Sequence, residues 1–277
     1  MNLQELTQLY NFSGRVVAIT GGAGLIGGEI ACALVGLGAH VAILDRNSEM
    51  AKQVVQRMGC DPGCAIVVYA DVLKRDSLEE ASARIREALG PVDTLINAAG
   101  GNHPDATTNP DRSFFSLADE ALRATFDLNI LGTVLPCQVF GQGMAEAGKG
   151  TILNISSMAA ISPLSRIPAY SAAKAGVSNF TQWLAVHMAQ EYSPHIRVNA
   201  IAPGFLLSEQ NRFLLWDEAA GDYTKRGKQV IDHTPMGRFG TAEDLLGAVL
   251  WLISDAASFV TGIVVPIDGG FSAYSGV

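Results

Sequence analysis

A tyrosine and a lysine four residues apart are the side chains of this sequence best suited to acid–base chemistry. Tyr170 and Lys174 lie in PAYSAAKAGVSNF, a segment whose pattern predicts a helix, so both project from one helix face. A phenol titrates near pH 10 and transfers protons poorly at neutral pH. Because a neighbouring ammonium group favours the phenolate, we expect Lys174 to lower the pKa of Tyr170. Any amphipathic helix surface can show the same spacing, so other motifs must support this interpretation.

A glycine-rich turn near the N-terminus predicts that the chain binds a pyrophosphate. TGGAGLIGG (20–28) directly follows an apolar run and opens an apolar helix. Gly21 and Gly24 allow a tight turn and a close approach to an anion, and Gly27 lets the helix pack closely against the sheet. The helix N-terminus adds N–H groups and a positive dipole. This strand–turn–helix context predicts a dinucleotide site.

An acidic residue at the end of the second apolar run bears on the identity of the dinucleotide. Asp45, 24 residues beyond Gly21, would accept hydrogen bonds from both hydroxyls of the adenosine ribose. Its charge would repel a 2′-phosphate, which favours NAD over NADP. Arg46 leaves NADP open, because a guanidinium can pair with that phosphate. A polar strand end that caps the next helix is the alternative interpretation of Asp45, Arg46 and Asn47.

Strands and helices alternate along the chain and would hold these residues in place. Short runs rich in Val and Ile predict strands that are buried on both faces, over 15–20, 40–44, 65–70, 94–99, 151–156, 196–202 and 262–268. Longer segments between them predict helices, over 25–37, 48–58, 77–89, 116–146, 168–191 and 241–254. We therefore predict an α/β class fold: a single-domain Rossmann fold over 1–277, with a doubly wound parallel sheet of about seven strands and helices on both faces.

Two stretches interrupt the alternation, 101–115 and 205–235. Each follows the carboxyl end of a predicted strand, which is the edge where open α/β sheets bind ligands. Long segments of this kind are often functional, so we expect both to form substrate-facing loops or a lid. The alternative is that both segments are surface loops that do not contact a substrate.

The charge balance narrows the class of partner. The 277 residues include 19 Lys plus Arg and 27 Asp plus Glu, a net charge of −8, without a basic run that could follow a phosphate backbone. We expect a small-molecule substrate and neither a nucleic-acid nor a membrane partner. The first fifteen residues lack the basic start and apolar block of a signal peptide, and no apolar stretch is long enough for a bilayer, which predicts a cytoplasmic protein.

The four cysteines follow no disulfide-framework spacing, and this also favours reducing, cytoplasmic surroundings. Cys60 and Cys64, in CDPGC, have no second pair of metal ligands nearby. We expect them to be free thiols in a turn, and we expect no metal site.

Taken together, the motifs resemble those of the short-chain dehydrogenase/reductase family, in its compact single-domain branch, over nearly the whole chain. Besides the glycine turn and the Tyr–Lys pair, the matching motifs are NAAG (97–100), FDLNI (126–130), NISS (154–157), NAIAPG (199–204), and VTG (260–262) followed by PIDGG (266–270). Leu25 departs from the small residue usual in this branch, and the turn also fits the epimerase/dehydratase branch. Asn97–Ala98 replaces the usual double Asn. The chain length, the APG turn and the DGG ending favour the compact branch.

The resemblance implies a role for each catalytic residue. Tyr170 is expected to be the general acid/base and Ser157 to orient the carbonyl or hydroxyl. Lys174 would position the ribose and tune the tyrosine, and Asn129 would support a water relay. Ser156 competes with Ser157 for its role, and the thirteen-residue offset to Tyr170 favours Ser157.

The resemblance also implies NAD as cofactor, with NADP as the alternative, bound along the carboxyl edge of the sheet. Asp71, in YADV, matches the family's adenine-contacting acid, and 97–100 match the stretch that supports the central sheet beside the cofactor. The expected cofactor-binding residues are Gly21, Gly24, Leu25, Ile26, Asp45, Arg46, Asp71, Val72, Asn97, Ala98, Ala99, Gly100, Tyr170, Lys174, Pro203, Gly204 and Leu206.

Longer matches indicate a narrower group. AGGNHPDATT, SSMAAISPLSRIPAYSAAKAGVSNFTQWLAVH, APGFLLSEQNR and the tail GGFSAYSGV resemble the D-mannonate oxidoreductase (fructuronate reductase) type, which implies hydride transfer between NAD(H) and a hexuronate-derived sugar acid. A polyol carboxylate needs several hydrogen-bond donors and a cation. The candidates to bind it are His103, Ser157, Arg166, Gln210, Asn211 and Arg212. Arg166 or Arg212 could pair with the carboxylate through two hydrogen bonds, and a solvated loop position is the alternative for each.

Other functions remain open at this stage. A keto-gluconate is one alternative substrate, and a hydrophobic acyl or steroid ketone is another. The apolar residues that could line a pocket for the latter are Phe205, Leu206, Leu207, Phe213, Leu214, Leu215 and Trp216. A third hypothesis is a regulator that binds NAD and catalyses no reaction. The intact Ser–Tyr–Lys–Asn set argues against it. Segments 116–146 and 168–191 are more apolar than one sheet face requires, so we expect a homo-oligomer, and the resemblance implies a tetramer.

Overall fold

The computed structural model of the chain describes residues 1–59, 63–208 and 212–276, with Phe213 by its backbone alone. Within this part of the chain, seven parallel strands form one sheet in the order β3-β2-β1-β4-β5-β6-β9. The strands are β1 (Val16–Thr20), β2 (His40–Asp45), β3 (Ala65–Tyr69), β4 (Thr94–Asn97), β5 (Gly150–Ile155), β6 (Ile196–Pro203) and β9 (Val264–Ile267). This arrangement is the doubly wound α/β fold that the alternation predicted.

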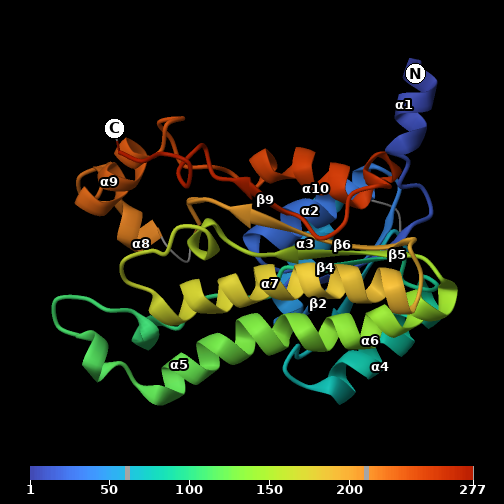
Figure 1. Cartoon of the computed structure of the whole chain (residues 1–277), viewed down its shortest axis with the longest axis horizontal. Coiled ribbons are helices and arrows are strands. Elements are labelled where there is room, and N and C mark those ends of the chain that lie inside the picture. Colours follow the sequence, from blue (N-terminus) through green and yellow to red (C-terminus); the bar gives the residue numbers. More distant parts are fainter. Residues whose placement is uncertain (60–62, 209–211, 277) are drawn as a thin grey trace.

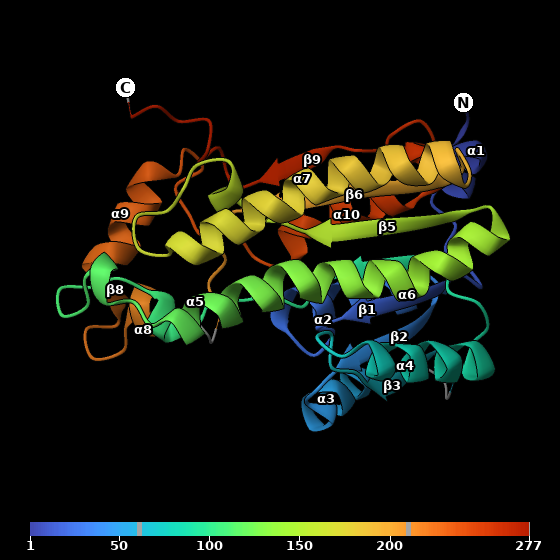
Figure 2. The ribbon, with the colours of Figure 1, turned by 60° about the horizontal axis from the view of Figure 1, so that its bottom comes forward.

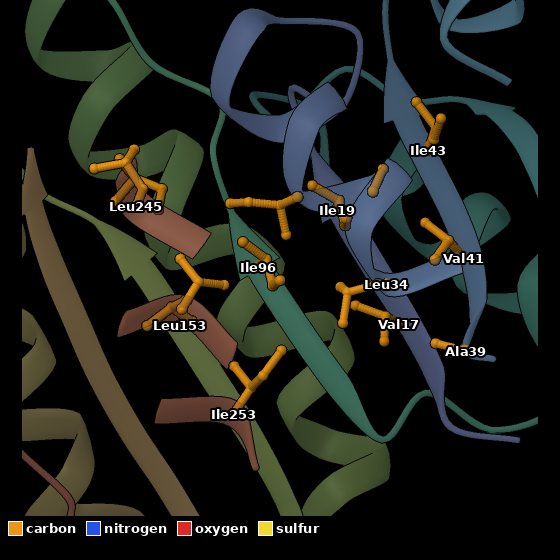
Figure 3. Close-up of a cluster of buried hydrophobic side chains, with 14 of the residues drawn as sticks. Val17, Ile19, Leu34, Ala39, Val41, Ile43, Ile96, Leu153, Leu245 and Ile253 are labelled. Atoms are coloured by element: carbon orange, nitrogen blue, oxygen red, sulfur yellow. The ribbon is translucent and has the colours of Figure 1, made fainter. Parts of the chain in front are cut away.

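Helices cover both faces of the sheet (Figure 1). They are α2 (Leu25–Gly36), α3 (Ser48–Met58), α4 (Arg75–Ala88), α5 (Asp119–Phe126), α6 (Gly132–Ala147), α7 (Pro168–Glu191) and α10 (Leu246–Ile253). Alternate residues of each strand face opposite layers, so the sheet separates two cores. Val17 and Ile19 of β1 pack with α2, α3 and α10. Figure 3 shows both in the cluster that includes Leu34 of α2 and Ile253 of α10. Val16 and Ala18 pack with α4, α6 and α7.

The strand order reverses at β1, which pairs with β2 on one side and with β4 on the other. Thr20 and Asn97, the last residues of β1 and β4, are register partners. The connections that leave these two strands diverge to opposite faces of the sheet and open a crevice between them. The glycine turn and 97–100 therefore meet at the position where this fold class binds ligands.

The segment 205–235 folds into small elements at the carboxyl end of the sheet. It contains α8 (Arg212–Leu215), the hairpin of β7 (Trp216–Asp217) and β8 (Asp222–Tyr223), and α9 (Lys225–His233). In Figure 2, α8 and α9 lie beyond the arrowheads of β5 and β9, while α1 (Leu3–Leu9) lies at the opposite end. Leu215, Val230 and Phe239 form a small buried cluster that anchors this segment.

The predicted helix over 116–146 is wrong as one element. The chain forms α5, a π-helical turn over Asp127–Leu131 and then α6, after a short 3₁₀ turn at Phe114–Ser116. Apolar periodicity cannot reveal a π-turn, because one inserted residue shifts the pattern without ending the helix. The helix α1 was also missed; its residues are mostly exposed, so it lacks the buried stripe that marks a helix in sequence.

The expectation of free thiols in CDPGC is wrong for Cys64, which is disulfide-bonded to a partner outside the described residues. A single disulfide needs no multi-cysteine framework, so the spacing argument did not exclude it. Cys32 and Cys137 are free. Where the chain is described, none of its helices is both long enough and apolar enough to cross a bilayer.

Candidate active site

The glycine turn has the backbone geometry of a phosphate cradle. Gly21 has a φ of 62°, and a Cβ there would lie 2.7 Å from the Cα of Ala99. A Cβ at Gly27 would lie 2.6 Å from the carbonyl oxygen of Gly21. Glycine is therefore required at both positions, one for the close approach to 97–100 and the other for the packing of α2.

The N-terminus of α2 is open to an anion. Its N-cap is Gly24, and no side chain of the described chain caps the helix, so the first N–H groups at Leu25 and Ile26 face outward from the helix end. Backbone donors combined with the helix dipole favour a phosphate at this position. The residues present thus fit the pyrophosphate of a dinucleotide.

Asp45 lies at the carboxyl end of β2, next to this turn. Its Oδ2 accepts a hydrogen bond from the backbone N–H of Ala23 at 3.1 Å, and its Oδ1 accepts one from Asn47 at 2.9 Å. These contacts fix the carboxylate beside the glycine turn and leave lone pairs for ribose hydroxyls. The side chain of Arg46 is exposed and lies next in sequence to this acid.

The expected adenine-side residues follow β3. Asp71 is nearly buried, and its Oδ1 accepts a hydrogen bond from the N–H of Leu73 at 3.1 Å. Val72 is buried and lies so close to Gly132 that a Cβ at Gly132 would be 3.0 Å from its Cγ2. The first turn of α6 therefore packs directly against the strand end that would meet the adenine.

Of the four residues 97–100, the first is directed away from the crevice. The Asn97 amide is buried and donates to Cys137 Sγ at 3.2 Å and to Asn154 Oδ1 at 2.9 Å. Its side chain thus ties β4 to β5 and α6, consistent with the supporting role that the resemblance implied. Ala98, Ala99 and Gly100 continue from the strand end to the crevice.

Ser157 and Tyr170 are brought together although thirteen residues separate them. Ser157, at the end of β5, caps the 3₁₀ turn Met158–Ala160, where its Oγ accepts from the N–H of Ala159 at 3.1 Å. Tyr170 lies in the first turn of α7, close enough to Ser157 for the serine hydroxyl to lower the pKa of the phenol. The two hydroxyl groups line the same cavity.

The other serine of NISS has a different environment. Ser156 is buried, donates to the carbonyl oxygen of Lys174 at 3.1 Å and contacts Ser178 Oγ at 2.7 Å. Both of its contacts are to α7, so Ser156 holds that helix against the sheet and only Ser157 reaches Tyr170.

The lysine of the pair lies deeper than the tyrosine. Lys174 is 4% exposed, its Nζ donates to the carbonyl oxygen of Ile155 at 2.7 Å, and that Nζ is 5.7 Å from the centre of the Tyr170 ring. Burial lowers the pKa of Lys174 from 10.5 to about 8. A cation without an adjacent carboxylate is costly in such surroundings, and this favours release of the proton.

In the chain by itself, Lys174 does not bring the pKa of Tyr170 below its ordinary value. Burial raises the pKa of Tyr170, and the hydrogen bond with Ser157 lowers it only in part. The cause is the position of Lys174, because its ammonium group donates to the carbonyl oxygen of Ile155 and lies over the ring of Tyr170. At neutral pH, Tyr170 is therefore a protonated phenol that can donate a proton.

Asn129 lies within the π-turn and is completely buried. Its amide donates to the carbonyl oxygens of Gly101 and Thr125, each at 2.7 Å, and its Oδ1 accepts from the N–H of Gly101 at 3.2 Å. A Cβ at Gly100 would lie 2.9 Å from this Oδ1 and 3.0 Å from Lys174 Nζ. Asn129, from the π-turn, and Lys174, from α7, thus both lie close to Gly100.

The strand β6 ends beside the same crevice. Pro203 is buried, and Gly204 lies so close to the C-terminal segment that a Cβ there would be 2.6 Å from the Cα of Asp268. Leu206 is nearly buried and forms a parallel bridge with Gly240. This stretch leads directly into the segment that holds α8 and α9.

A cavity of about 600 Å³ connects the Ser157–Tyr170 pair with both of the long segments. From 101–115 it is lined by residues that include Asn102, Thr108 and Arg112, and from 204–226 by residues that include Phe205, Leu214 and Arg226. The volume suits a small-molecule ligand. Both segments therefore face the space in front of the two hydroxyl groups.

The expected substrate-binding residues divide between the cavity and its surroundings. Arg166 lines the cavity. His103 is exposed and caps a 3₁₀ turn, where its Nδ1 accepts from the N–H of Asp105 at 3.1 Å. Arg212 pairs with Glu218 and lies over the Trp216 ring. Gln210 and Asn211 lie outside the described residues, and so does the side chain of Phe213.

Two arginines of the cavity were missed in the sequence, Arg112 and Arg226. Each belongs to one of the two segments predicted to face the substrate, and that was the only available signal. Which basic residues of a long segment turn inward depends on its fold, so spacing could not single them out.

The apolar residues of the 205–235 segment serve two purposes. Leu215 belongs to the small buried cluster, and Phe205 and Leu207 pack against it. Phe205, Leu206, Leu214 and Leu215 also line the cavity. The cavity wall is thus mixed, with apolar surface from this segment and polar groups from 101–115 and the start of α7.

A seven-stranded doubly wound sheet with a glycine turn at its switch point and a Ser–Tyr–Lys set beside it defines a dinucleotide-dependent oxidoreductase. The family model described as enoyl-(acyl carrier protein) reductase matches residues 21–272. The chain belongs to the short-chain dehydrogenase/reductase family and is a dehydrogenase/reductase.

Relatives match nearly the whole length of the chain. An oxidoreductase called UxuB from Bacillus subtilis, whose activity is uncharacterized, is 48% identical over 276 residues, 96% of this chain and 98% of that protein. The structure of a candidate D-mannonate oxidoreductase from Haemophilus influenza with bound NAD is 44% identical, with a TM-score of 0.90, over 98% of this chain and all of that one. A gluconate 5-dehydrogenase from Burkholderia cenocepacia, solved with NADP and tartrate, is 29% identical, with a TM-score of 0.83, over 97% and 99% of the two chains.

Proposed function

We propose that this enzyme interconverts a keto sugar acid and its hydroxy acid, of the D-fructuronate/D-mannonate type, with NAD(H) as cofactor. The observation that carries the proposal is that Ser157 and Tyr170 open on the same cavity as several basic and amide side chains. A sugar acid needs many hydrogen-bond donors and a cation, and this wall provides both. The 44% identity to the candidate D-mannonate oxidoreductase with bound NAD supports the same substrate class.

The chain's own residues account for the movement of the proton. In the reducing direction, the phenol of Tyr170 donates its proton to the carbonyl oxygen as that oxygen becomes an alcohol. Ser157 donates a hydrogen bond to the same oxygen and stabilises its developing charge. When bound, the nicotinamide cofactor supplies the hydride or accepts it.

A replacement proton reaches Tyr170 along the buried side of the site. Lys174, whose pKa is lowered to about 8 by burial, is near the point at which it can both give and take a proton. Asn129 and the backbone of Gly101 lie on the far side of Gly100 and continue the path toward the cavity. Oxidation of the hydroxy acid uses the same groups in reverse.

The residues proposed to hold the cofactor are those of the crevice. The glycine turn and the start of α2 would bind the pyrophosphate, and Asp45 the adenosine ribose. Asp71 and Val72 would lie against the adenine, Lys174 would reach the second ribose, and 203–206 would border the nicotinamide. The acid at position 45 favours NAD, and the NADP of the Burkholderia cenocepacia structure is the alternative.

Initial rates with three keto acids test the proposal. NADH oxidation is measured with D-fructuronate, D-tagaturonate and 5-keto-D-gluconate, and each series is repeated with NADPH. We expect fast turnover of D-fructuronate with NADH. Preference for 5-keto-D-gluconate would instead assign the enzyme to the gluconate 5-dehydrogenase type. Absence of turnover with all three, together with reduction of an acyl or steroid ketone, would refute the sugar-acid assignment.

We also propose that the enzyme is a homo-oligomer, and a tetramer by its family resemblance. The outer face of α7 supports this proposal, because Trp183 and Val186 are each 57% exposed there and the Trp183 ring stacks on His187. Exposed apolar side chains that gather on one helix favour association. Light scattering coupled to size-exclusion chromatography should give a mass four times 29.2 kDa, and a monomeric mass would refute the proposal.

A further inference from the structure

Among the described residues, three arginines line the cavity, and one of them, Arg112, is paired there with an acid. Arg112 donates to Asp105 Oδ1 at 2.6 Å and to the carbonyl oxygen of Pro104 at 2.9 Å. Over the described parts of the chain, no side chain or carbonyl accepts a hydrogen bond from the guanidinium of Arg166 or Arg226. Asp105, the acid among the lining residues described, is already engaged by Arg112. Within the described residues, the cavity therefore carries two positive charges that no acid pairs with.

These two arginines come from elements far apart in sequence. Arg166 lies just before α7, and its carbonyl oxygen accepts from the N–H of Thr108, which joins it to the 101–115 segment. Arg226 is the second residue of α9. They are close enough for the positive charge of Arg166 to act on Arg226: the pKa of Arg226 is lowered, first by burial and then by this repulsion.

The position of Arg226 is determined by close packing. Thr224 caps α9 by accepting from the N–H of Gly227 at 3.0 Å. A Cβ at Gly227 would lie 2.3 Å from the carbonyl oxygen of Leu215, so the first turn of α9 presses directly on α8. Val230, one turn further on, belongs to the small buried cluster with Leu215. Arg226 thus extends from a fixed helix turn.

We propose that Arg226 and Arg166 together bind the carboxylate of the substrate, and that Arg226 makes the cavity select acids over neutral sugars. Two guanidinium groups held near each other without counter-charges repel, and a carboxylate placed between them removes that cost. A guanidinium binds a carboxylate through two parallel hydrogen bonds, which also orients it. With the carboxylate held there, the chain of the substrate extends toward Ser157 and Tyr170 in the same cavity. This inference rests on the proposed function for the identity of the acid.

Replacement of Arg226 tests the inference through substrate preference. With NADH, kcat/KM is measured for D-fructuronate and for D-fructose, its neutral analogue, in wild type, Arg226→Gln and Arg226→Lys. We expect Arg226→Gln to lower kcat/KM for the acid by about 30-fold or more, chiefly through KM, and to lower it much less for the neutral sugar, so that the preference for the acid falls. Arg226→Lys keeps the charge without the paired hydrogen bonds, so its kcat/KM for the acid should lie between those of wild type and Arg226→Gln.

A neighbouring cation provides the matched control. Lys225, next to Arg226 on α9, is exposed and is not among the residues that line the cavity. Lys225→Gln removes the same charge from the same helix turn and should leave the preference unchanged. Equal NADH affinity and equal unfolding midpoints in all variants would establish that the fold is intact. An unaltered acid preference in Arg226→Gln would overturn the inference.

A binding measurement separates this inference from the proposed function. Tartrate, a small dicarboxylate, is titrated into the enzyme–NADH complex by calorimetry, with glycerol as the neutral probe. We expect Arg226→Gln to weaken tartrate binding by about 10-fold or more and to leave glycerol unaffected. If D-fructuronate is not turned over but tartrate binding depends on Arg226, the proposed function fails and the anion site stands. If D-fructuronate is turned over equally well by Arg226→Gln, the function stands and the inference fails.

Discussion

The buried ammonium group of Lys174 should destabilise the folded protein at neutral pH. Its pKa falls from 10.5 to about 8 on folding, and this difference corresponds to about 3 kcal/mol of lost stability when the group is charged in both states. Lys174→Met removes this cost. It also leaves the carbonyl oxygen of Ile155 without its donor, which costs roughly 1–3 kcal/mol. The variant should therefore be inactive, yet up to about 2 kcal/mol more stable than wild type at pH 7.

The pH dependence gives the sharper test of this prediction. Between the folded pKa and the unfolded pKa, the unfolded chain binds more protons than the folded protein at Lys174, so the stability of wild type rises with pH in this window. Relative to Lys174→Met, wild type should gain about 2 kcal/mol between pH 7 and pH 9.5. Urea unfolding of the cofactor-free enzyme, followed by tryptophan fluorescence at one protein concentration, measures the difference.

An exposed lysine serves as the control for that experiment. Lys149 lies on the surface at the far end of α6, and Lys149→Met should change stability by the same small amount at both pH values. A stability difference between wild type and Lys174→Met that does not change with pH would refute the reasoning. It would mean that the protein compensates the ammonium charge and that Lys174 is not poised to exchange a proton.

Three other substitutions test the cofactor cradle and the chemistry. Tyr170→Phe should retain NADH binding and lose turnover by about 10²-fold or more, since the proton donor is gone; substantial remaining activity would contradict its role. Gly27→Ala places a methyl group 2.6 Å from the Gly21 carbonyl oxygen. It should weaken NADH binding at least about 10-fold and lower the free energy of unfolding by about 1–3 kcal/mol. Gly36→Ala, on the same helix with open space around it, is the control and should be neutral or slightly stabilising in urea unfolding. Asp45→Asn should lower the NADH/NADPH ratio of kcat/KM by about 10-fold, and an unchanged ratio would exclude Asp45 as the selective residue.

Local sequence patterns were sufficient to predict the sheet, because each strand is a short apolar run and each connection is long enough for a helix. The glycine turn could also be predicted from the sequence, since only glycine tolerates the contacts of Gly21 and Gly27 with neighbouring backbone. The π-turn around Asn129 could not be predicted from the sequence, because it changes the hydrogen-bond register of the helix without changing its amino-acid composition. The local helix of the 205–235 segment that carries Arg226 was missed for a related reason: its apolar residues serve a small satellite core, and their spacing does not reveal that.

For the site, the sequence by itself determined which residue types are available and which of them share a strand end or a helix face. Tyr170 and Lys174 are neighbours by helix geometry alone. The tertiary structure decided that Ser157 and not Ser156 reaches Tyr170, that Lys174 is committed to the Ile155 carbonyl oxygen, and that Arg226 faces the cavity while Arg212 pairs with Glu218. Contacts of this kind depend on how distant segments pack, and so does the burial that raises the pKa of Tyr170 and lowers that of Lys174. No local pattern contains that information, because the field at each group comes from atoms far away in the chain.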